Sequence, residues 1–79
     1  MSFVTKASGG DGWTSWSVRR HGDDMTIRVF SNTENVKADT PSGWEPKTVF
    51  EATIRDYTGR NAIALALSES NRYGALMAQ

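Results

Sequence analysis

The sequence predicts a small α+β domain, an antiparallel sheet of three or four strands with one C-terminal helix packed on one face. Three observations predict it. Two runs rich in Trp, Val, Ile, Phe and Thr flank a turn that contains Gly and Asp; a third, β-branched run follows a polar connection; and a stretch rich in Ala and Leu lies near the C-terminal end. A chain of 79 residues suffices for one domain with a thin core.

Composition excludes several classes of protein. The chain has no cysteine and one histidine, which excludes a disulfide scaffold, a thiolate zinc site and a cysteine nucleophile. Nine basic residues balance nine acidic ones, and this neutrality argues against a general nucleic-acid coat protein. Residues 1–12 lack the apolar segment of a signal peptide, and no stretch is apolar enough to cross a membrane. We therefore expect a cytoplasmic protein without a cofactor or metal.

The first elements are expected to be a flexible N-terminal segment, residues 1–12, and a β-hairpin, residues 13–31. Three glycines between residues 9 and 12 suggest a loop, although residues 3–6 form a possible short strand. The hairpin turn lies at His21–Asp24, where Gly and Asp suit a tight turn. Side chains alternate across a strand, so the hairpin has two faces. The expected core face carries Trp16, Val18, Ile27 and Val29, and the outer face Trp13, Arg19, Arg28 and Phe30.

A long loop is predicted over residues 32–46, with a short edge strand possible at residues 36–38. Trp44 lies between two prolines in this loop, and we expect it to pack as a lid over the edge of the core; an exposed binding anchor is the alternative. Residues 47–57 are predicted as a strand because of their β-branched content, with Phe50, Ala52 and Ile54 facing the core. A helix ending at Gly59 is the other possible interpretation of this segment.

The last predicted element is a helix over residues 59–72. Alanine favours a helix, Thr58 is a plausible N-cap, and Gly74 is a plausible stop. A strand remains possible, since apolar residues alternate with alanines. The helical periodicity puts four residues on one face: Ile63, Ala66, Leu67 and Ser70.

The sequence offers little for catalysis. His21 precedes Asp23 and Asp24, which resembles an acid–base pair, but all three suit a turn. The glycines at 9–12 lack the lysine of a phosphate-binding loop. Asp11, Asp23, Asp24 and His21 do not follow the spacing of a calcium loop. We expect that the protein is not an enzyme.

A binding role follows from the outer face instead. Aromatic residues and arginine are enriched in interface hot spots, and this short chain has three Trp, three Phe and two Tyr. The alternative is a single-stranded nucleic-acid-binding domain, in which arginines contact phosphates and aromatic rings stack on bases; a virion component is a third possibility. The predicted partner-binding residues are Trp13, Arg19, Asp23, Asp24, Arg28, Phe30 and Arg55.

The hairpin at residues 13–31, followed by the Ala- and Leu-rich segment at residues 60–71, resembles the plan of small phage-encoded anti-CRISPR proteins. Within these, the chain is most similar to inhibitors of type I surveillance complexes, including the I-C type. The resemblance covers the overall plan, so no family residue is carried over. It implies a non-enzymatic, phage- or mobile-element-encoded inhibitor in the host bacterial cytoplasm, and we expect a monomer. Such a protein binds a Cas subunit and sterically blocks DNA binding or nuclease recruitment.

Overall fold

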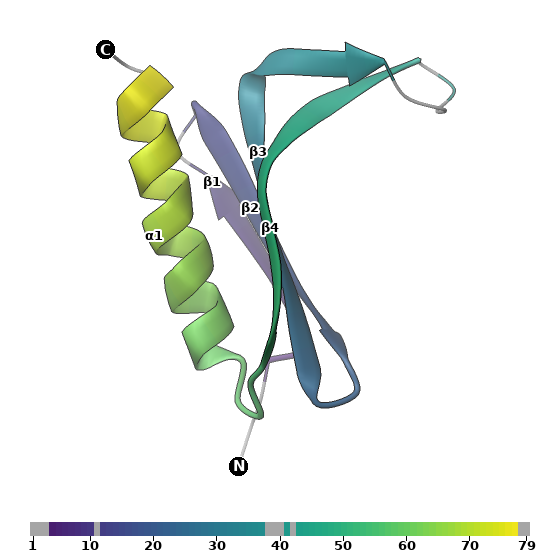
Figure 1. The fold of residues 1–79 in the computed structure, drawn as a ribbon, viewed down its shortest axis with the longest axis vertical. Helices are drawn as coiled ribbons and strands as arrows, with labels where there is room; N and C mark the ends of the chain where they lie inside the picture. The colour runs from purple at the N-terminus through teal and green to yellow at the C-terminus, as the bar shows by residue number, and fades with distance from the viewer. Residues whose placement is uncertain (1–3, 11, 38–40, 42, 78–79) are drawn as a thin grey trace.

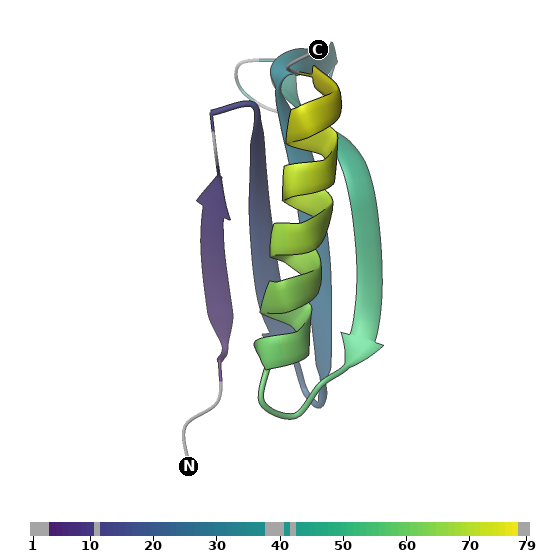
Figure 2. The same cartoon turned by 90° about the vertical axis from the view of Figure 1, so that its left-hand side faces the viewer.

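The computed structural model describes residues 4–10, 12–37, 41 and 43–77. A four-stranded antiparallel sheet has its strands in chain order, and one helix covers one face (Figures 1 and 2). The elements are β1 (Lys6–Gly10), β2 (Thr14–His21), β3 (Asp24–Lys37), β4 (Trp44–Arg55) and α1 (Arg60–Met77). The predicted α+β architecture is confirmed. Within the described residues, no helix has both the length and the apolar character needed to span a membrane.

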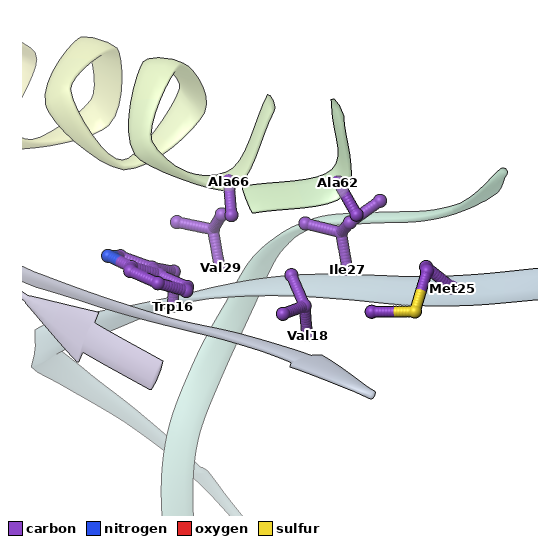
Figure 3. Packing of buried hydrophobic residues seen from close by; sticks show 7 residues of the cluster. All are labelled: Trp16, Val18, Met25, Ile27, Val29, Ala62 and Ala66. Carbon is purple, nitrogen blue, oxygen red and sulfur yellow. The ribbon is translucent and has the colours of Figure 1, made fainter. Parts of the chain in front are cut away.

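The core lies between α1 and the two central strands. The predicted alternation is confirmed, because β2 and β3 pair without a register shift from Thr14–Ser31 to His21–Asp24. One face of this hairpin therefore points all its apolar side chains at the helix, as Figure 3 shows. The buried cluster consists of Trp16, Val18, Met25, Ile27, Val29, Ala62 and Ala66.

The helix contacts the sheet through small residues. Ala62, Ala66 and Ser70 are buried at four-residue spacing, and Gly74 is buried one turn further along. Leu67, predicted on this face, is 44% exposed, so that prediction was wrong. The prediction that Gly74 ends the helix was also wrong, since α1 continues to Met77. Small side chains let the helix lie close to the sheet, whose larger side chains fill the volume between them.

A buried polar contact joins the end of the hairpin to the helix. The Thr14 hydroxyl donates a hydrogen bond to the Ser70 carbonyl at 2.9 Å, and the two hydroxyl oxygens lie 2.6 Å apart. Both side chains would lose hydrogen bonds to water on burial, and this contact replaces them.

The predicted flexible segment contains an edge strand, β1, which pairs with β2 from Lys6–Arg19 to Gly10–Ser15. Gly9 lies opposite Trp16, and a Cβ atom at Gly9 would approach the indole to 2.9 Å. The glycine is therefore needed because the Trp16 ring lies against it. The glycine-rich composition suggested a loop, but here it accommodates a large neighbouring side chain. Residues 1–3 and 11 lie outside the described residues.

At the hairpin end of the sheet, Arg20 joins three segments. Its guanidinium donates hydrogen bonds to the carbonyls of Val4 at 2.9 Å, Asp56 at 3.2 Å and Tyr57 at 2.8 Å. These carbonyls belong to the segment before β1 and to the connection between β4 and α1. Arg20 thus fixes where the helix begins relative to the sheet.

Asp56 organises the first turn of α1. Its carboxylate accepts a hydrogen bond from the Ala62 N–H at 2.9 Å. Thr58, the predicted N-cap, accepts from the Arg60 N–H at 3.3 Å. Both bonds satisfy N–H groups that lack partners within the helix. The bond from Ala62 is the main reason that the pKa of Asp56 lies below its ordinary value.

The strand predicted over residues 47–57 lies within β4, and Phe50 and Ile54 pack partly buried against the core as expected. Most of the predicted loop at residues 32–46 is also strand, contrary to expectation. The polar sequence shows no apolar alternation there, and backbone pairing between β3 and β4 holds this segment. Ala38, the end of the possible edge strand, lies outside the described residues.

We call residues 31–37 of β3 and 44–48 of β4 the arm. Its base is irregular: Phe30 pairs with Thr48 and Asn35 with Pro46, so four residues of β3 oppose one residue of β4. The Ser31 hydroxyl accepts hydrogen bonds from the N–H groups of Thr33 and Glu34, both at 3.2 Å. Bulges of this kind bend a strand pair, and Figure 1 shows the arm turning away from α1, toward the uncovered side of the sheet.

Trp44 lies in the arm and is 59% exposed. The prediction that it packs as a lid over the core was therefore wrong. The bend carries this part of β4 away from the helix and the core. The alternative prediction for Trp44, an exposed side chain available for binding, agrees with its exposed fraction.

Candidate functional site

The sheet has one face that α1 leaves uncovered, which we call the open face. Its members follow from strand register, since directly paired residues share a face. Hydroxyl and charged side chains dominate it, and Phe30 is its half-buried aromatic residue. The open face comprises Lys6, Ser8, Ser15, Ser17, Arg19, His21, Asp24, Thr26, Arg28, Phe30, Thr48, Glu51, Thr53 and Arg55.

The half of the open face formed by β3 and β4 is internally matched. Arg28 forms an ion pair with Glu51 at 2.9 Å, and the hydroxyl oxygens of Thr26 and Thr53 lie 3.3 Å apart. Asp24 is the register partner of Arg55. Complementary cross-strand pairs of this kind stabilise a sheet modestly.

The half formed by β1 and β2 is not matched. Lys6 and Arg19 are direct register partners, and both are exposed. Within the described part of the chain, neither side chain takes part in an ion pair or side-chain hydrogen bond. Like charges placed directly opposite each other destabilise a strand pair. The open face therefore carries an uncompensated positive region over these two strands.

Two surface hollows meet at Arg19. One lies over β2 and β3 and is lined by Ser17, Arg19, His21, Thr26 and Arg28. The other lies over β1 and β2, and Lys6, Ala7, Ser8, Ser17, Val18 and Arg19 line it. The polar groups of the first hollow are guanidinium, imidazole and hydroxyl groups, and no carboxylate of the described residues lines either hollow. Such a lining suits an anionic group that accepts several hydrogen bonds.

The structure places the predicted partner-binding residues in three regions. Arg19, Asp24, Arg28, Phe30 and Arg55 lie on the open face, with Asp24 at its hairpin end. Asp23 is exposed in the hairpin turn beside it, and its carbonyl accepts a hydrogen bond from the Asp56 N–H at 3.2 Å.

Trp13 lies at the other end of β2. It is 45% exposed, and its carbonyl accepts a hydrogen bond from the Asn32 N–H at the base of the arm, at 2.9 Å. The length of β2 separates this residue from the aspartates of the hairpin turn by roughly 25 Å. The seven predicted residues therefore extend along the whole length of β2 and beyond it, and do not form one compact patch.

Sequence reasoning missed Lys6 and Ser8, because β1 was not predicted as a strand. It also assigned His21 to the turn, whereas His21 is the last residue of β2 and lines a hollow. The possible short strand at residues 3–6 was the one indication of a strand near Lys6, but it ended at the residue where β1 begins. Asp11, one of the acidic residues considered for metal binding, lies outside the described residues. Among the described residues there is no group of three or more His, Cys, Asp or Glu residues suited to hold a metal.

The chain matches none of the protein-family models, curated proteins or solved structures with which it was compared. What the open face binds therefore has to be inferred from its own side chains.

Proposed function

We propose that this chain is a non-enzymatic binding protein that acts by covering a surface of a partner protein with its open face. The observation that carries the proposal is the composition of that face. Arginines, hydroxyls and both charge signs lie on a regular scaffold, and the described chain does not cover them. Arginine-rich surfaces with mixed charge suit recognition of one specific protein surface.

The same face suits nucleic acid less well. The Glu51 carboxylate lies beside Arg28, and Asp24 lies opposite Arg55, so two anionic groups would face a phosphate backbone. Phe30 is half-buried at the base of the arm and offers little ring surface on which bases could stack. A mixed-charge protein surface is the better complement.

The exposed tryptophans support the same proposal. Trp13 directly precedes β2 and Trp44 begins β4 in the arm, and both expose about half of their surface. Tryptophan is a frequent interface hot spot because it buries a large apolar area on binding. A partner that reaches from the arginines to the arm would cover both a polar and an apolar region.

In its specific form, the proposal names the partner as a Cas subunit of a type I surveillance complex, with the I-C type as the candidate subtype. Binding would take place in the host bacterial cytoplasm. Support comes from the small α+β plan. Binding would be stoichiometric, and inhibition steric. The monomer would block either target-DNA binding or nuclease recruitment.

The test uses purified type I-C surveillance complex and the purified chain. We expect co-elution on size-exclusion chromatography and loss of target-DNA binding or of nuclease recruitment. Replacing Arg19, Arg28 and Arg55 together by Ala should leave the melting temperature nearly unchanged, since exposed residues contribute little to stability. Affinity should fall about tenfold or more, because charged interface contacts are lost.

The control removes exposed charge on α1 instead, by replacing Arg60 and Arg72 with Ala. These residues are exposed and lie outside both the open face and the arm. Loss of affinity in this double variant equal to that in the triple variant would contradict the role of the open face. Failure of the wild-type chain to bind the complex would reject the Cas subunit as the partner. Tight binding to single-stranded DNA that weakens steeply with salt would favour the nucleic-acid alternative.

A further inference from the structure

The pair Lys6 and Arg19 is unusual because it does not stabilise the fold. The two residues oppose each other across β1 and β2, on the exposed side of an edge strand. Repulsion between directly opposed like charges disfavours this pairing. Nearby carboxylates are engaged elsewhere, since Glu51 pairs with Arg28 and Asp24 lies between His21 and Arg55 in the register.

Hydrogen-bond donors from neighbouring strands surround Arg19, and this arrangement suits the binding of a ligand. Arg19 and Ser17 line both hollows of the open face, so a ligand at Arg19 can also reach donors from three strands. Ser17 and Arg28 are register partners, as are Arg19 and Thr26, which brings two guanidinium and two hydroxyl groups into adjacent rows. Direct partners in such rows have Cβ atoms about 5 Å apart.

The charges of the whole face favour an anion with a small number of negative groups. Four basic residues on it (Lys6, Arg19, Arg28, Arg55) oppose two acidic ones (Asp24, Glu51), which leaves an excess of two positive charges with His21 neutral. The excess lies over β1 and β2, whereas the carboxylates lie over β3 and β4. A continuous polyphosphate backbone laid across the sheet would meet those carboxylates; a short acidic segment placed over β1 and β2 would not.

We propose that Lys6 and Arg19, with the hollows that meet at Arg19, bind carboxylate side chains of an acidic segment on the partner protein. This inference rests on the proposed function and specifies the chemistry of the partner. A carboxylate accepts two parallel hydrogen bonds from a guanidinium, and the hydroxyls of Ser17 and Thr26 supply further donors. A bound carboxylate also relieves the repulsion between Lys6 and Arg19.

The test is a titration of the isotope-labelled chain with hexaglutamate at low ionic strength, followed by two-dimensional NMR. Saturable shifts are expected at the backbone amides of Lys6, Ser17, Arg19, Thr26 and Arg28. Lys6→Glu and Arg19→Glu should each weaken binding about tenfold or more, as expected when a charge-assisted contact becomes repulsive. Neither variant should lower the melting temperature, because each converts a like-charge pair into an opposite-charge pair. A residue with a merely structural role would not combine lost binding with retained stability.

Arg60→Glu provides the control, because it reverses one exposed charge at the start of α1, away from the open face. If it weakens hexaglutamate binding as much as Arg19→Glu, the effect is one of net charge and the assigned site is wrong. Absence of saturable shifts at the named amides also overturns the inference. Tighter binding of hexathymidylate than of hexaglutamate at the same amides would assign the site to phosphate.

Failure of this inference can be told apart from failure of the proposed function. If hexaglutamate does not bind but the partner complex forms and the triple arginine variant weakens it, the open face binds a protein by other chemistry. If hexaglutamate binds at the predicted amides but no complex forms with the surveillance complex, the acidic-segment site stands and the identity of the partner changes.

Discussion

The two faces of the sheet are built from the same strands but differ in burial: one face is apolar and packed against α1, and the other is polar and exposed. On the covered face, Val18 and Ile27 are almost completely buried against α1, and the hydrogen bonds of Arg20 close the end of the sheet. On the open face, the neighbouring residues Arg19 and Arg28 are exposed. A shift of one position along a strand thus changes a side chain from a determinant of stability to a candidate determinant of binding.

The difference teaches that the residues that stabilise this small domain are distinct from those proposed to bind a partner. The core needs its apolar face complete, since a domain of this size has only about 3–5 kcal/mol of stability from its core. The open face includes the opposed cations Lys6 and Arg19, which no folding requirement explains. Substitutions at adjacent positions therefore test the comparison directly.

The largest effect is expected for Ile27→Asp. Ile27 is fully buried, and an unpaired carboxylate there costs several kcal/mol, comparable with the whole stability of the domain. We expect no cooperative thermal transition by circular dichroism. The control is Arg28→Ser at the next position, which should melt within a few degrees of the wild type. Similar melting curves for both variants would show that the two faces are assigned wrongly. Phe50→Asp should be milder than Ile27→Asp, since Phe50 is half-buried.

An intermediate effect is expected for Arg20→Met. The substitution keeps an unbranched, flexible stem, although a shorter one, and removes the donors to the carbonyls of Val4, Asp56 and Tyr57. We expect a loss of about 2–3 kcal/mol in the free energy of unfolding, measured by urea denaturation. Arg19→Met, on the opposite face, should change the free energy by less than about 0.5 kcal/mol. If Arg20→Met were as mild as its neighbour, these hydrogen bonds would not stabilise the fold.

The smallest effect is expected for Asp56→Asn, and it depends on pH. Because the folded-state pKa of Asp56 lies below its ordinary value of 3.8, the contribution of its charged form is present above that pH. The contribution is lost as the pH falls through the lower folded-state value. The variant should therefore melt below the wild type near neutral pH, and the two melting temperatures should converge in strong acid. A constant difference across this pH range would contradict the role of the Asp56 charge.

The covered face could be predicted well from the sequence because its buried residues alternate with more exposed ones along each strand of the hairpin. Alternation through Trp16 and Val18, and through Ile27 and Val29, reflects burial, and the glycine in the turn sets the register. The helix was found from its alanines. Its buried side was only partly found, because the residues that touch the sheet are small and the larger Leu67 is exposed.

The remaining features depend on contacts that a single sequence does not reveal. β1 forms because β2 offers a free edge and because Gly9 fits beneath Trp16. The arm is held by backbone pairing without a buried face, so it leaves no apolar periodicity. The arginines of the open face followed from alternation, but the opposition of Lys6 and Arg19 required the register of a strand that the sequence did not predict.

The stripe of Ala62, Ala66, Ser70 and Gly74 has an evolutionary consequence. A helix that meets its sheet through such small side chains tolerates few replacements on that side, since each added methylene has to displace a neighbour. The open face lies on the other side of the sheet and has no share in this contact. Packing of the helix therefore does not limit substitutions there, and alternate positions of β2 and β3 can change while the contact between α1 and the sheet stays the same.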